Sequence, residues 1–471
     1  MLVTDGVGVR NFVHGRFLEV AMEAGLEVEV YLGVPLAAVD ADIRRRGLSC
    51  RWLEMPIYRE SPQSRFWRKT LELAHLKTHR TVSMQETLRR RRNSFSSLTG
   101  VLNSAADLFS TVCTTRKRIL SLAAAHERSA AANPLTAWYR DKLRAWRPDL
   151  VFCTHQRPTQ LVPVVAGAHG LGIPVASFIF SWDNLTSKGT MPARFDAFLV
   201  WSELMKSELW RFYPEIQSNR IKIVGAPQFE PYVYPQYGWS EAEFARQLGL
   251  RPGLRRLCFS CCDVTTSPND PAYIRLLAEA NEAGEFGEEI EIIVRPSPAE
   301  GDDRFAEVKR QFPTLKWSPP RWRQTRDAHP EPWSQRTPCR EDLDLLKSVT
   351  QYCDLNVNIA STMSLDFAFA GRPVINVGLG HSGNPHFAPD RYYYSFDHYV
   401  PIVKSGGVRV VYERKDLVEA VRRYLREPQL DAEGRERMKA LEVGAPLRGT
   451  SERLLQALQE IDAAVRCTSP S

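Results

Sequence analysis

Hydrophobic and polar positions follow two alternating patterns along the first half of the chain. Short apolar runs, typical of strands buried on both faces, are separated by stretches in which apolar residues recur at helical spacing. The pattern predicts helices at 12–24 and 161–169, and strands at 27–32, 149–153, 174–180, 195–201 and 221–224. This order is typical of a parallel sheet covered by helices.

The same alternation starts again after residues 225–232, where two prolines interrupt regular structure. It predicts strands at 257–262, 290–295, 355–359 and 374–377, and helices at 272–283, 343–352, 363–370, 416–425 and 450–465. The fold class is therefore α/β, with two doubly wound, Rossmann-like domains facing across a cleft. We expect domains at 1–225 and 226–447, and a closing helix and tail at 448–471.

Residues 60–130 do not fit this alternation, because they have helical periodicity and no strand pattern. They are rich in arginine and lysine, with four consecutive arginines at 89–92. One interpretation is an inserted pair of helices with a solvated basic face. A second is docking on an anionic membrane surface, where each basic residue contributes about 1 kcal/mol. Nucleic acid is a third and weaker interpretation.

Composition narrows the classes of protein. The chain has 471 residues, 43% of them hydrophobic and 25% charged, which excludes a peptide hormone, a disulfide mini-protein and global disorder. Its net charge of +7 is too small and too dispersed to require nucleic acid, but suits an anionic small molecule or an acidic membrane. The nine cysteines have neither zinc spacing nor the pattern of a secreted framework, which favours a reducing compartment.

The sequence has no signal for secretion or for crossing a membrane. No segment approaches about 18 uninterrupted apolar residues, and residues 1–30 lack a basic region followed by an apolar one. We therefore expect a cytoplasmic protein, with peripheral attachment to the inner face of the membrane through the basic insert as an open alternative.

The strongest chemical signal lies at 356–376. A predicted buried strand ends at residue 359, Ser361 and Thr362 follow, and a helix containing Asp366 begins at once. Hydroxyls and backbone N–H groups at such a helix start can bind an anion, since ligands of doubly wound sheets lie beyond the carboxyl ends of strands. Ordinary helix capping explains the same residues.

Two further elements could bind a phosphate in the second half. Arg295 ends a predicted strand, where its guanidinium could contact phosphate in a bidentate manner; the alternative is a surface ion pair with Glu300 or Asp302. Thr266 and Ser267 lie in a loop rich in hydroxyls and amides after another strand. That loop suits a phosphate or a ribose, or simply caps the next helix.

The first half offers candidates for an acceptor site. The loop after the first strand contains Gly6-x-Gly8 but has Asn11 where a dinucleotide fingerprint needs its third glycine, which argues against a dehydrogenase. The same loop could shape an acceptor pocket. Polar residues also follow two later strands, at 153–157 and 180–189. The acceptor-side candidates are Arg10, Asn11, Trp182, Asn184 and Lys188.

A base that takes a proton from an acceptor hydroxyl is the remaining requirement. The sequence offers four candidates and does not rank them: His155, Asp183, Asp5 and His14. We expect no metal and no cofactor. Asp342 and Asp344 open a helix, where residues two apart point away from each other, and the loop with His381 and His386 lacks a third ligand at metal spacing.

Several motifs resemble those of the GT-B glycosyltransferases. More narrowly, the chain is similar to bacterial proteins of surface-polysaccharide loci related to CDP-glycerol glycerophosphotransferases. The resemblance spans nearly the whole chain and is carried by the motifs at 5–12, 181–184, 200–206, 225–229, 294–296 and 361–366. It implies a nucleotide in the C-terminal half, an acceptor in the N-terminal half and usually no metal. Ser297 stands where similar proteins often have histidine, so any phosphate role of that histidine is lost or shifts to Arg295.

These observations predict a glycosyltransferase of polysaccharide or glycolipid biosynthesis. A nucleotide-activated sugar is its expected donor, and a hydroxyl of a glycan or glycolipid is its expected acceptor. Ser361, Thr362 and Arg295 would stabilise the departing phosphate. Transfer of a polyol phosphate from a CDP donor is one alternative, and an inert scaffold that binds a nucleotide or a partner is another.

Overall fold

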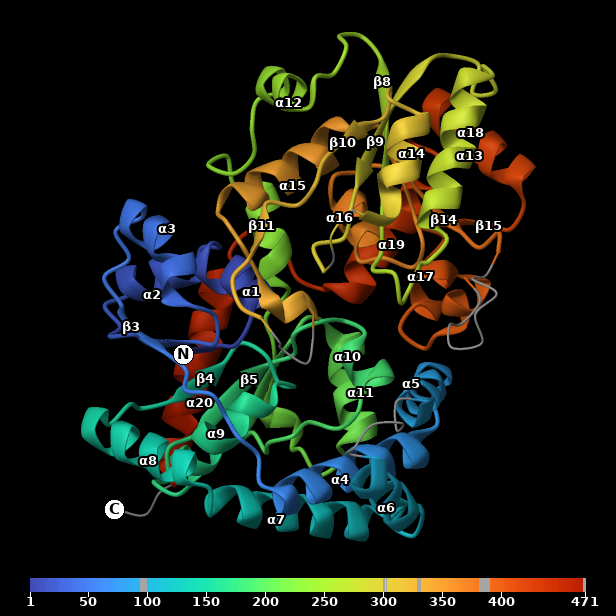
Figure 1. The fold of residues 1–471 in the computed structure, drawn as a ribbon. Helices are drawn as coiled ribbons and strands as arrows, with labels where there is room; N and C mark the ends of the chain where they lie inside the picture. The colour runs from blue at the N-terminus through green and yellow to red at the C-terminus, as the bar shows by residue number, and fades with distance from the viewer. Residues whose placement is uncertain (94–99, 300, 302, 328–331, 381–389, 469–471) are drawn as a thin grey trace. The chain divides into compact units, whose positions relative to one another are not determined.

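A computed structural model describes residues 1–93, 100–299, 301, 303–327, 332–380 and 390–468 (Figure 1). The chain divides into two compact units. The N-terminal unit comprises Met1–Gly8, Arg16–Ala226 and Gly449–Ser471, and the C-terminal unit comprises Val9–Gly15 and Pro227–Arg448. The short segment Val9–Gly15 therefore groups with the second unit, although its place in the sequence assigns it to the first.

The N-terminal unit is built on a seven-stranded sheet of order β3-β2-β1-β4-β5-β6-β7, in which every neighbouring pair is parallel. Most of its strands are buried along their length, which is why they read as apolar runs. The strands are β1 (Leu2–Val3), β2 (Glu29–Leu32), β3 (Arg51–Glu54), β4 (Val151–Cys153), β5 (Val175–Phe178), β6 (Ala197–Val200) and β7 (Ile221–Ile223).

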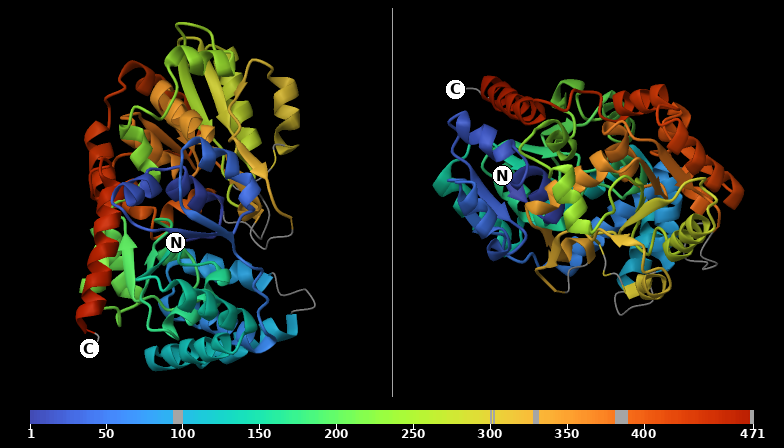
Figure 2. Two further views of the ribbon diagram at one scale, coloured as in Figure 1. Left: turned by 90° about the vertical axis from the view of Figure 1, so that its left-hand side faces the viewer. Right: turned by 90° about the horizontal axis from the view of Figure 1, so that it is seen from above.

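Helices cover this sheet, and one of them comes from the far end of the sequence. Helix α20 (Thr450–Thr468) contacts α2 (Phe17–Glu23), and Figures 1 and 2 show it in red against the N-terminal unit. Ion pairs of Arg16 with Glu452 at 3.0 Å and of Lys222 with Glu460 at 2.7 Å join it to the start of α2 and to the edge strand β7. The other helices of this unit outside residues 60–130 include α3 (Asp40–Arg45), α8 (Pro134–Trp146), α9 (Val162–His169), α10 (Asn184–Ser187) and α11 (Glu203–Phe212).

The helix predicted at 12–24 is wrong as a single element. The structure has a short helix α1 (Gly6–Gly8) and a π-helical turn η1 (Val9–Val13), and α2 starts only at residue 17. Gly15 separates them. A Cβ atom at Gly15 would lie 2.3 Å from the carbonyl oxygen of Asn11, so the backbone can turn this closely only with glycine.

The insert at 60–130 contains four helices rather than the expected pair. They are α4 (Pro62–His79), α5 (Val82–Asn93), α6 (Gly100–Thr111) and α7 (Arg116–Ala131), which lie together in Figure 1. Helix α4 contacts the other three. Leu71, Ala74, Cys113, Ile119 and Leu122 form the buried core between these helices. This core explains the helical periodicity without strands.

The C-terminal unit has a six-stranded parallel sheet of order β10-β9-β8-β13-β14-β15 and a separate antiparallel pair, β11 and β12. The strands are β8 (Arg255–Ser260), β9 (Ile290–Arg295), β10 (Lys316–Trp317), β11 (Trp322–Gln324), β12 (Arg336–Pro338), β13 (Leu355–Asn358), β14 (Val374–Val377) and β15 (Arg409–Val411). Each strand predicted for this half is present within a few residues of its expected bounds.

Eight α-helices are described in this unit. They are α12 (Glu241–Leu248), α13 (Asp270–Glu282), α14 (Ala306–Gln311), α15 (Glu341–Tyr352), α16 (Met363–Phe369), α17 (Val400–Ser405), α18 (Arg414–Arg426) and α19 (Ala432–Glu442), preceded by a 3₁₀ segment η5 (Pro227–Val233). None of the described helices, in either unit, combines the length and the apolar character needed to span a bilayer.

Both sheets have a point where the strand order reverses direction. In the N-terminal sheet it lies between β1 and β4, and in the C-terminal sheet between β8 and β13. The loops that follow these two strands run to opposite faces of the sheet, leaving a crevice at their carboxyl ends where ligands of doubly wound folds bind. The fold therefore directs attention to the residues after β1, β4, β8 and β13.

His169 ties the end of α9 to the sheet of the N-terminal unit. Its Nε2 lies 3.1 Å from Asp196 Oδ2, and the same carboxylate oxygen accepts a hydrogen bond of 2.9 Å from the N–H of Val175, the first residue of β5. Burial disfavours the imidazolium, but hydrogen bonds to Asp196 and Glu127 outweigh it and raise the pKa of His169 to about 9.

We expect this pair to make stability depend on pH in the alkaline range. Because the pKa is raised on folding, the stabilisation is fully present below the ordinary value of 6.5 and is lost as the pH rises through about 9. The protein should exceed His169→Gln in free energy of unfolding at about pH 6, and the difference should shrink by about pH 10. Urea denaturation at both pH values measures it. A difference that is constant or grows with pH contradicts the assignment.

Candidate functional site

The loops on either side of the C-terminal reversal point are joined directly. Residues 261–269 follow β8, and residues 359–362 follow β13. The Cys262 thiol donates a hydrogen bond to the carbonyl oxygen of Ile359 at 3.1 Å. The two loops in which the sequence predicts phosphate-binding hydroxyls therefore lie next to each other.

The turn between β13 and α16 has a strained backbone. Ala360 has a φ of 43°, in the left-handed region that costs a residue with a side chain roughly 1–2 kcal/mol. The N–H of Ser361 donates to Asn358 Oδ1 at 3.1 Å, and Ser361 Oγ accepts from the N–H of Met363 at 3.3 Å. Ser361 and Thr362 are half-buried. Such a strained backbone is retained only where many surrounding contacts hold it in place. Strained residues are often found at functional sites.

A buried polar network holds this turn. Asn358 Nδ2 donates to Asn356 Oδ1 at 2.6 Å, and Asn376 Nδ2 donates to Asn358 Oδ1 at 3.0 Å. Asn356 continues the network to Ser260 Oγ at 2.7 Å, and the Tyr399 hydroxyl donates to Asn376 Oδ1 at 2.9 Å. All five side chains are buried. Because an unmatched amide is costly in an apolar interior, the interlocking bonds fix the end of β13.

Arg295 lies at the end of β9, as expected, but it is largely committed inside the unit. Its side chain is buried, and its guanidinium lies 3.4 Å from both Asp342 Oδ1 and the Ser318 carbonyl oxygen. The ion-pair partner is thus Asp342, while Glu300 and Asp302 lie outside the described residues. Both contacts are long and use two of the five N–H donors of arginine, so donors remain for a phosphate.

Asp342 and Asp344 have separate structural roles. Asp342 is buried and also accepts from Trp322 Nε1 at 2.7 Å, whereas Asp344 accepts from the N–H of Gly238 at 2.8 Å. Within the described part of the chain, no group of three or more His, Cys, Asp or Glu side chains is placed to hold a metal. The loop with His381 and His386 lies outside that part.

The loop after β8 is organised around a buried carboxylate. Asp270 accepts from Ser267 Oγ at 2.6 Å and pairs with Arg304 at 3.1 Å. Burial raises the pKa of Asp270 to about 7, although Ser267 and Arg304 oppose the shift. Ser267 is therefore an internal residue, while Thr266 is half-buried and bonds to Asp263 at 3.1 Å. Of the two predicted ligand residues, Thr266 is the more accessible.

Asp366 belongs to a second buried cluster. Its carboxylate accepts a hydrogen bond from the hydroxyl of Tyr232 in η5. Burial raises the pKa of Asp366 to about 6, and the positive charges of Arg10 and Arg295 act in the opposite direction. Arg10 Nε donates to Asn11 Oδ1 at 3.1 Å. Arg10, one of the acceptor-side candidates, thus contributes positive charge within the C-terminal unit.

His14 occupies a buried position in the same unit. Its Nε2 lies 3.1 Å from the carbonyl oxygen of Pro338 in β12, and its own carbonyl oxygen accepts from the Tyr237 hydroxyl at 3.4 Å. These contacts, and those of η1 with β12 and η5, explain why Val9–Gly15 groups with the C-terminal unit. His14 therefore groups with the C-terminal unit, whereas Asp5, His155 and Asp183 group with the N-terminal unit.

At the N-terminal reversal point, the structure brings Asp5 and His155 together. Asp5 Oδ2 lies 2.9 Å from His155 Nδ1, both side chains are buried, and the Phe180 ring stacks on the imidazole with a centroid separation of 3.8 Å. Burial raises the pKa of Asp5, but hydrogen bonds from His155, Gly8 and Thr4 outweigh it, so the pKa is lowered overall. An ionised Asp5 makes Nδ1 the donor and stabilises the imidazolium that forms when Nε2 accepts a proton.

The remaining candidates of this unit form a neighbouring chain of hydrogen bonds. Gln156 Nε2 donates to Asn184 Oδ1 at 3.0 Å, and Asn184 Nδ2 donates to Asp183 Oδ1 at 3.0 Å. The other oxygen of Asp183 lies 3.3 Å from Lys188 Nζ. Trp182 is buried. Asp183 is thus bound at both carboxylate oxygens.

Some residues that shape these sites are not predicted from the sequence. Asn356 and Asn358 carry a usable signal, since amides at alternate positions of an otherwise apolar strand point to one buried face. Arg304 and Tyr232 carry none, because their partners lie 34 and 134 residues away in the sequence.

Comparison with known proteins identifies the fold. No family model and no curated protein matches the sequence. Among solved structures, the chain is similar to UDP-GlcNAc 2-epimerase from Neisseria meningitidis bound to UDP-GlcNAc, with a TM-score of 0.54, 10% identity and 96% of each chain covered. For the S. aureus MnaA–UDP structure these values are 0.53, 10%, and 100% of this chain and 98% of that one.

A glycosyltransferase from Rickettsia africae matches with a TM-score of 0.50 and 9% identity over 96% of each chain. Together with the two parallel, doubly wound sheets, these similarities show that the chain has the GT-B fold.

Proposed function

We propose that this protein is a glycosyltransferase that transfers a sugar from a nucleoside-diphosphate donor to a hydroxyl acceptor. One observation carries the proposal: in both units, candidate polar residues lie at the point where the strand order of the sheet reverses. Asp5 and His155 follow β1 and β4, and the strained turn with Ser361 follows β13.

The donor is assigned to the C-terminal unit. The turn at 359–362 presents half-buried hydroxyls, the adjacent loop adds Thr266, and Arg295 ends the strand beside β8. A departing diphosphate needs such prearranged donors and positive charge, because they stabilise charge that develops in the transition state. The network behind Ser361 supports this role, since it holds the turn before any ligand binds.

His155 is the proposed base, positioned by Asp5. The carboxylate–imidazole pair suits proton transfer from an acceptor hydroxyl, whereas Asp183 is already bound by Asn184 and Lys188. Asp5 is a positioning residue in this scheme, because it acts through the imidazole.

A second candidate is epimerisation of a nucleotide sugar. It is favoured by the similarity to the UDP-GlcNAc 2-epimerase bound to UDP-GlcNAc and to the MnaA–UDP structure. The two functions differ in their products. A transferase releases the nucleoside diphosphate only when an acceptor takes the sugar, whereas an epimerase changes the sugar without an acceptor.

The donor assignment predicts stabilisation by one nucleoside diphosphate. Thermal unfolding with UDP, GDP, CDP, ADP and dTDP, each at about 100 times its dissociation constant, should show about 2.7 kcal/mol of stabilisation for a matching ligand. Arg295→Lys should weaken that nucleotide about tenfold, because lysine keeps the charge opposite Asp342 but loses the planar donors. Arg414→Gln, an exposed arginine paired with Glu285 in the same unit, is the control and should bind normally.

The outcomes separate the alternatives. Stabilisation by CDP alone favours transfer of a polyol phosphate. If the protein converts a bound UDP-sugar only to its epimer, epimerisation is favoured. If no nucleotide stabilises the protein, the donor assignment is wrong and a binding scaffold is the better account.

The base assignment predicts a loss of turnover without a loss of donor binding. His155→Asn should lower kcat about 10²- to 10⁴-fold and remove the acidic limb of the pH–rate profile, while the dissociation constant of the nucleotide stays unchanged. His79→Gln, a histidine of the helical insert, serves as the control. Equal turnover for His155→Asn and the parent rejects this base, and a loss that leaves the pH profile unaltered indicates a structural role.

A further inference from the structure

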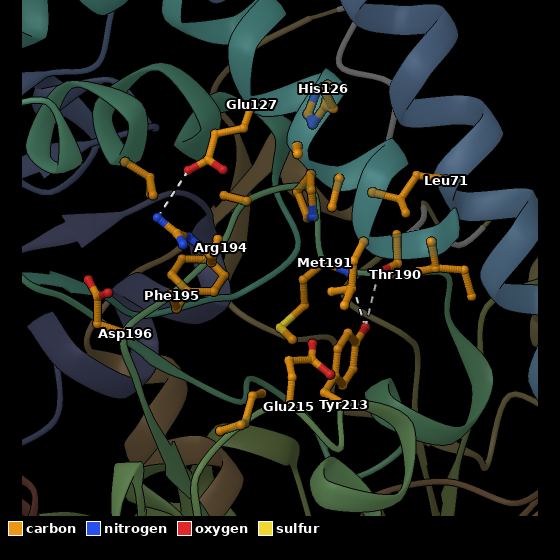
Figure 3. Close-up of a pocket in the computed structure, with 18 of the residues that line it drawn as sticks. Leu71, His126, Glu127, Thr190, Met191, Arg194, Phe195, Asp196, Tyr213 and Glu215 are labelled. Atoms are coloured by element: carbon orange, nitrogen blue, oxygen red, sulfur yellow. Dashed lines mark hydrogen bonds and ion pairs between the residues drawn. The ribbon is translucent and has the colours of Figure 1, made fainter. Parts of the chain in front are cut away.

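The N-terminal unit contains a cavity of about 500 Å³ that the proposed function does not use (Figure 3). Its walls come from α7, α9, the segment 190–196 before β6, and the segment 213–220 that leads into β7. Asp5, His155, Asp183 and Lys188 are not among the residues that line it. A pocket of this volume is in the range that takes a small organic ligand.

The inner wall is mostly apolar, with aliphatic and aromatic side chains and the buried His126. Buried side chains from three different elements face the space, and alanines on α7 and α9 leave room between them. Figure 3 shows Met191, an adaptable side chain, beside the aromatic rings of Phe195 and Tyr213. The buried and small residues of this wall include Leu71, Ile119, Val162, Val165, Ala124 and Ala166.

The wall provides few hydrogen-bonding groups for a sugar or a nucleotide. The hydroxyls of Thr190 and Tyr213 lie 3.3 Å apart, and the latter also accepts a hydrogen bond of 3.2 Å from the N–H of Met191. These polar groups already satisfy one another, so a ligand rich in hydroxyls would lose its hydrogen bonds to water without replacement. An aliphatic chain has no hydrogen bonds to water to lose, and its removal from water is favourable.

The arginines and carboxylates that line the cavity are exposed or half-buried, whereas His126 is buried, with its Nε2 3.8 Å from Glu60 Oε1. Two of the acidic residues are already matched. Glu215 forms an ion pair with Arg116, and Glu127 lies 3.5 Å from Arg194, a pair drawn in Figure 3. Neither carboxylate therefore adds uncompensated negative charge.

The balance of the remaining charges is positive. Asp196 is matched by His169 at 3.1 Å, whose pKa of about 9 keeps it a cation at neutral pH. Arg220 donates to the carbonyl oxygen of Asp196 at 3.3 Å, and no carboxylate in the described part of the chain pairs with it. The cavity thus combines a mostly apolar interior with one arginine available for an anion.

We propose that this cavity binds an amphiphile with one aliphatic chain and an anionic head, the chain lying between α7 and α9 and the head at Arg220. A fatty acid and a lipid phosphate share this chemistry. The site is independent of the proposed transferase function, because it shares no residue with that site and needs no nucleotide.

An independent observation points to lipid as the source of the chain. Helices α6 and α7 and the segment between them expose large apolar side chains: Val101 is 83% exposed, Leu108 77%, Val112 57% and Leu120 43%. Leu120 also lines the cavity. Residues 82–131 contain eight basic and three acidic residues, so this part of the insert suits an anionic bilayer.

Calorimetric titration of the full chain with alkyl amphiphiles below their micelle concentrations tests the site. Decyl phosphate should bind at one per chain, and decyltrimethylammonium should bind about tenfold more weakly or less. Across octyl, decyl and dodecyl phosphate, affinity should rise about fourfold per CH₂ group until the cavity is filled. Arg220→Gln should remove the preference for phosphate and keep the dependence on chain length.

Filling the cavity gives the decisive comparison. Ala124→Phe should lower the affinity for decyl phosphate at least about tenfold, whereas Ser121→Phe, an exposed position on the same helix, should not. Ala166→Phe fills the space from α9 and replaces the first variant if thermal unfolding shows that variant to be unfolded. Equal affinity of the folded filled variant and the parent, or no binding of decyl phosphate, overturns the proposal.

Phosphatidylglycerol vesicles distinguish the two sources. Transfer of lipid from the vesicles to the parent, and less to the filled variant, identifies a bilayer lipid. Binding of decyl phosphate without such transfer identifies a free amphiphile, and both results support the cavity.

Discussion

Three buried asparagines hold the C-terminal unit in the form that its site requires. Asn356, Asn358 and Asn376 lie on adjacent parallel strands and share their amide hydrogens and oxygens with one another. An amide removed from water must find a partner, so each side chain fixes the next. The left-handed backbone of Ala360 is tolerated because Asn358 binds the N–H of Ser361. Rigidity at the turn is thus obtained from the core of the sheet.

The N-terminal unit solves a similar problem with charge instead of amides. Asp5 remains ionised although it is buried, because His155, Gly8 and Thr4 all donate to it. The imidazole is in turn held by the ring of Phe180. In both units, polar groups that oppose folding when isolated are kept because they satisfy one another at the end of a parallel sheet.

Features that depend on local sequence patterns could be predicted from the sequence, whereas pairings between distant residues could not. The apolar runs predict the strands of both sheets except the partly buried edge strands β3, β10 and β15. The change from strand to helix period at 359–363 places Ser361 and Thr362 at a strand end. The Asp342 partner of Arg295 lies 47 residues away and leaves no local trace. Nor does any pattern assign Val9–Gly15 to the C-terminal unit, because that depends on contacts with β12 and η5. Helical periodicity likewise indicates helix in the insert without showing where four helices end.

The discontinuity of the two units has a consequence for biosynthesis. Helix α20 follows the whole C-terminal unit in the sequence and contacts α2, which precedes that unit's main segment. The N-terminal unit therefore cannot complete its packing during translation until the whole C-terminal unit has been synthesised. Four crossings between units also mean that neither unit corresponds to a single stretch of the gene. Recombination that exchanges one half of such a gene would separate α20 from the sheet it covers.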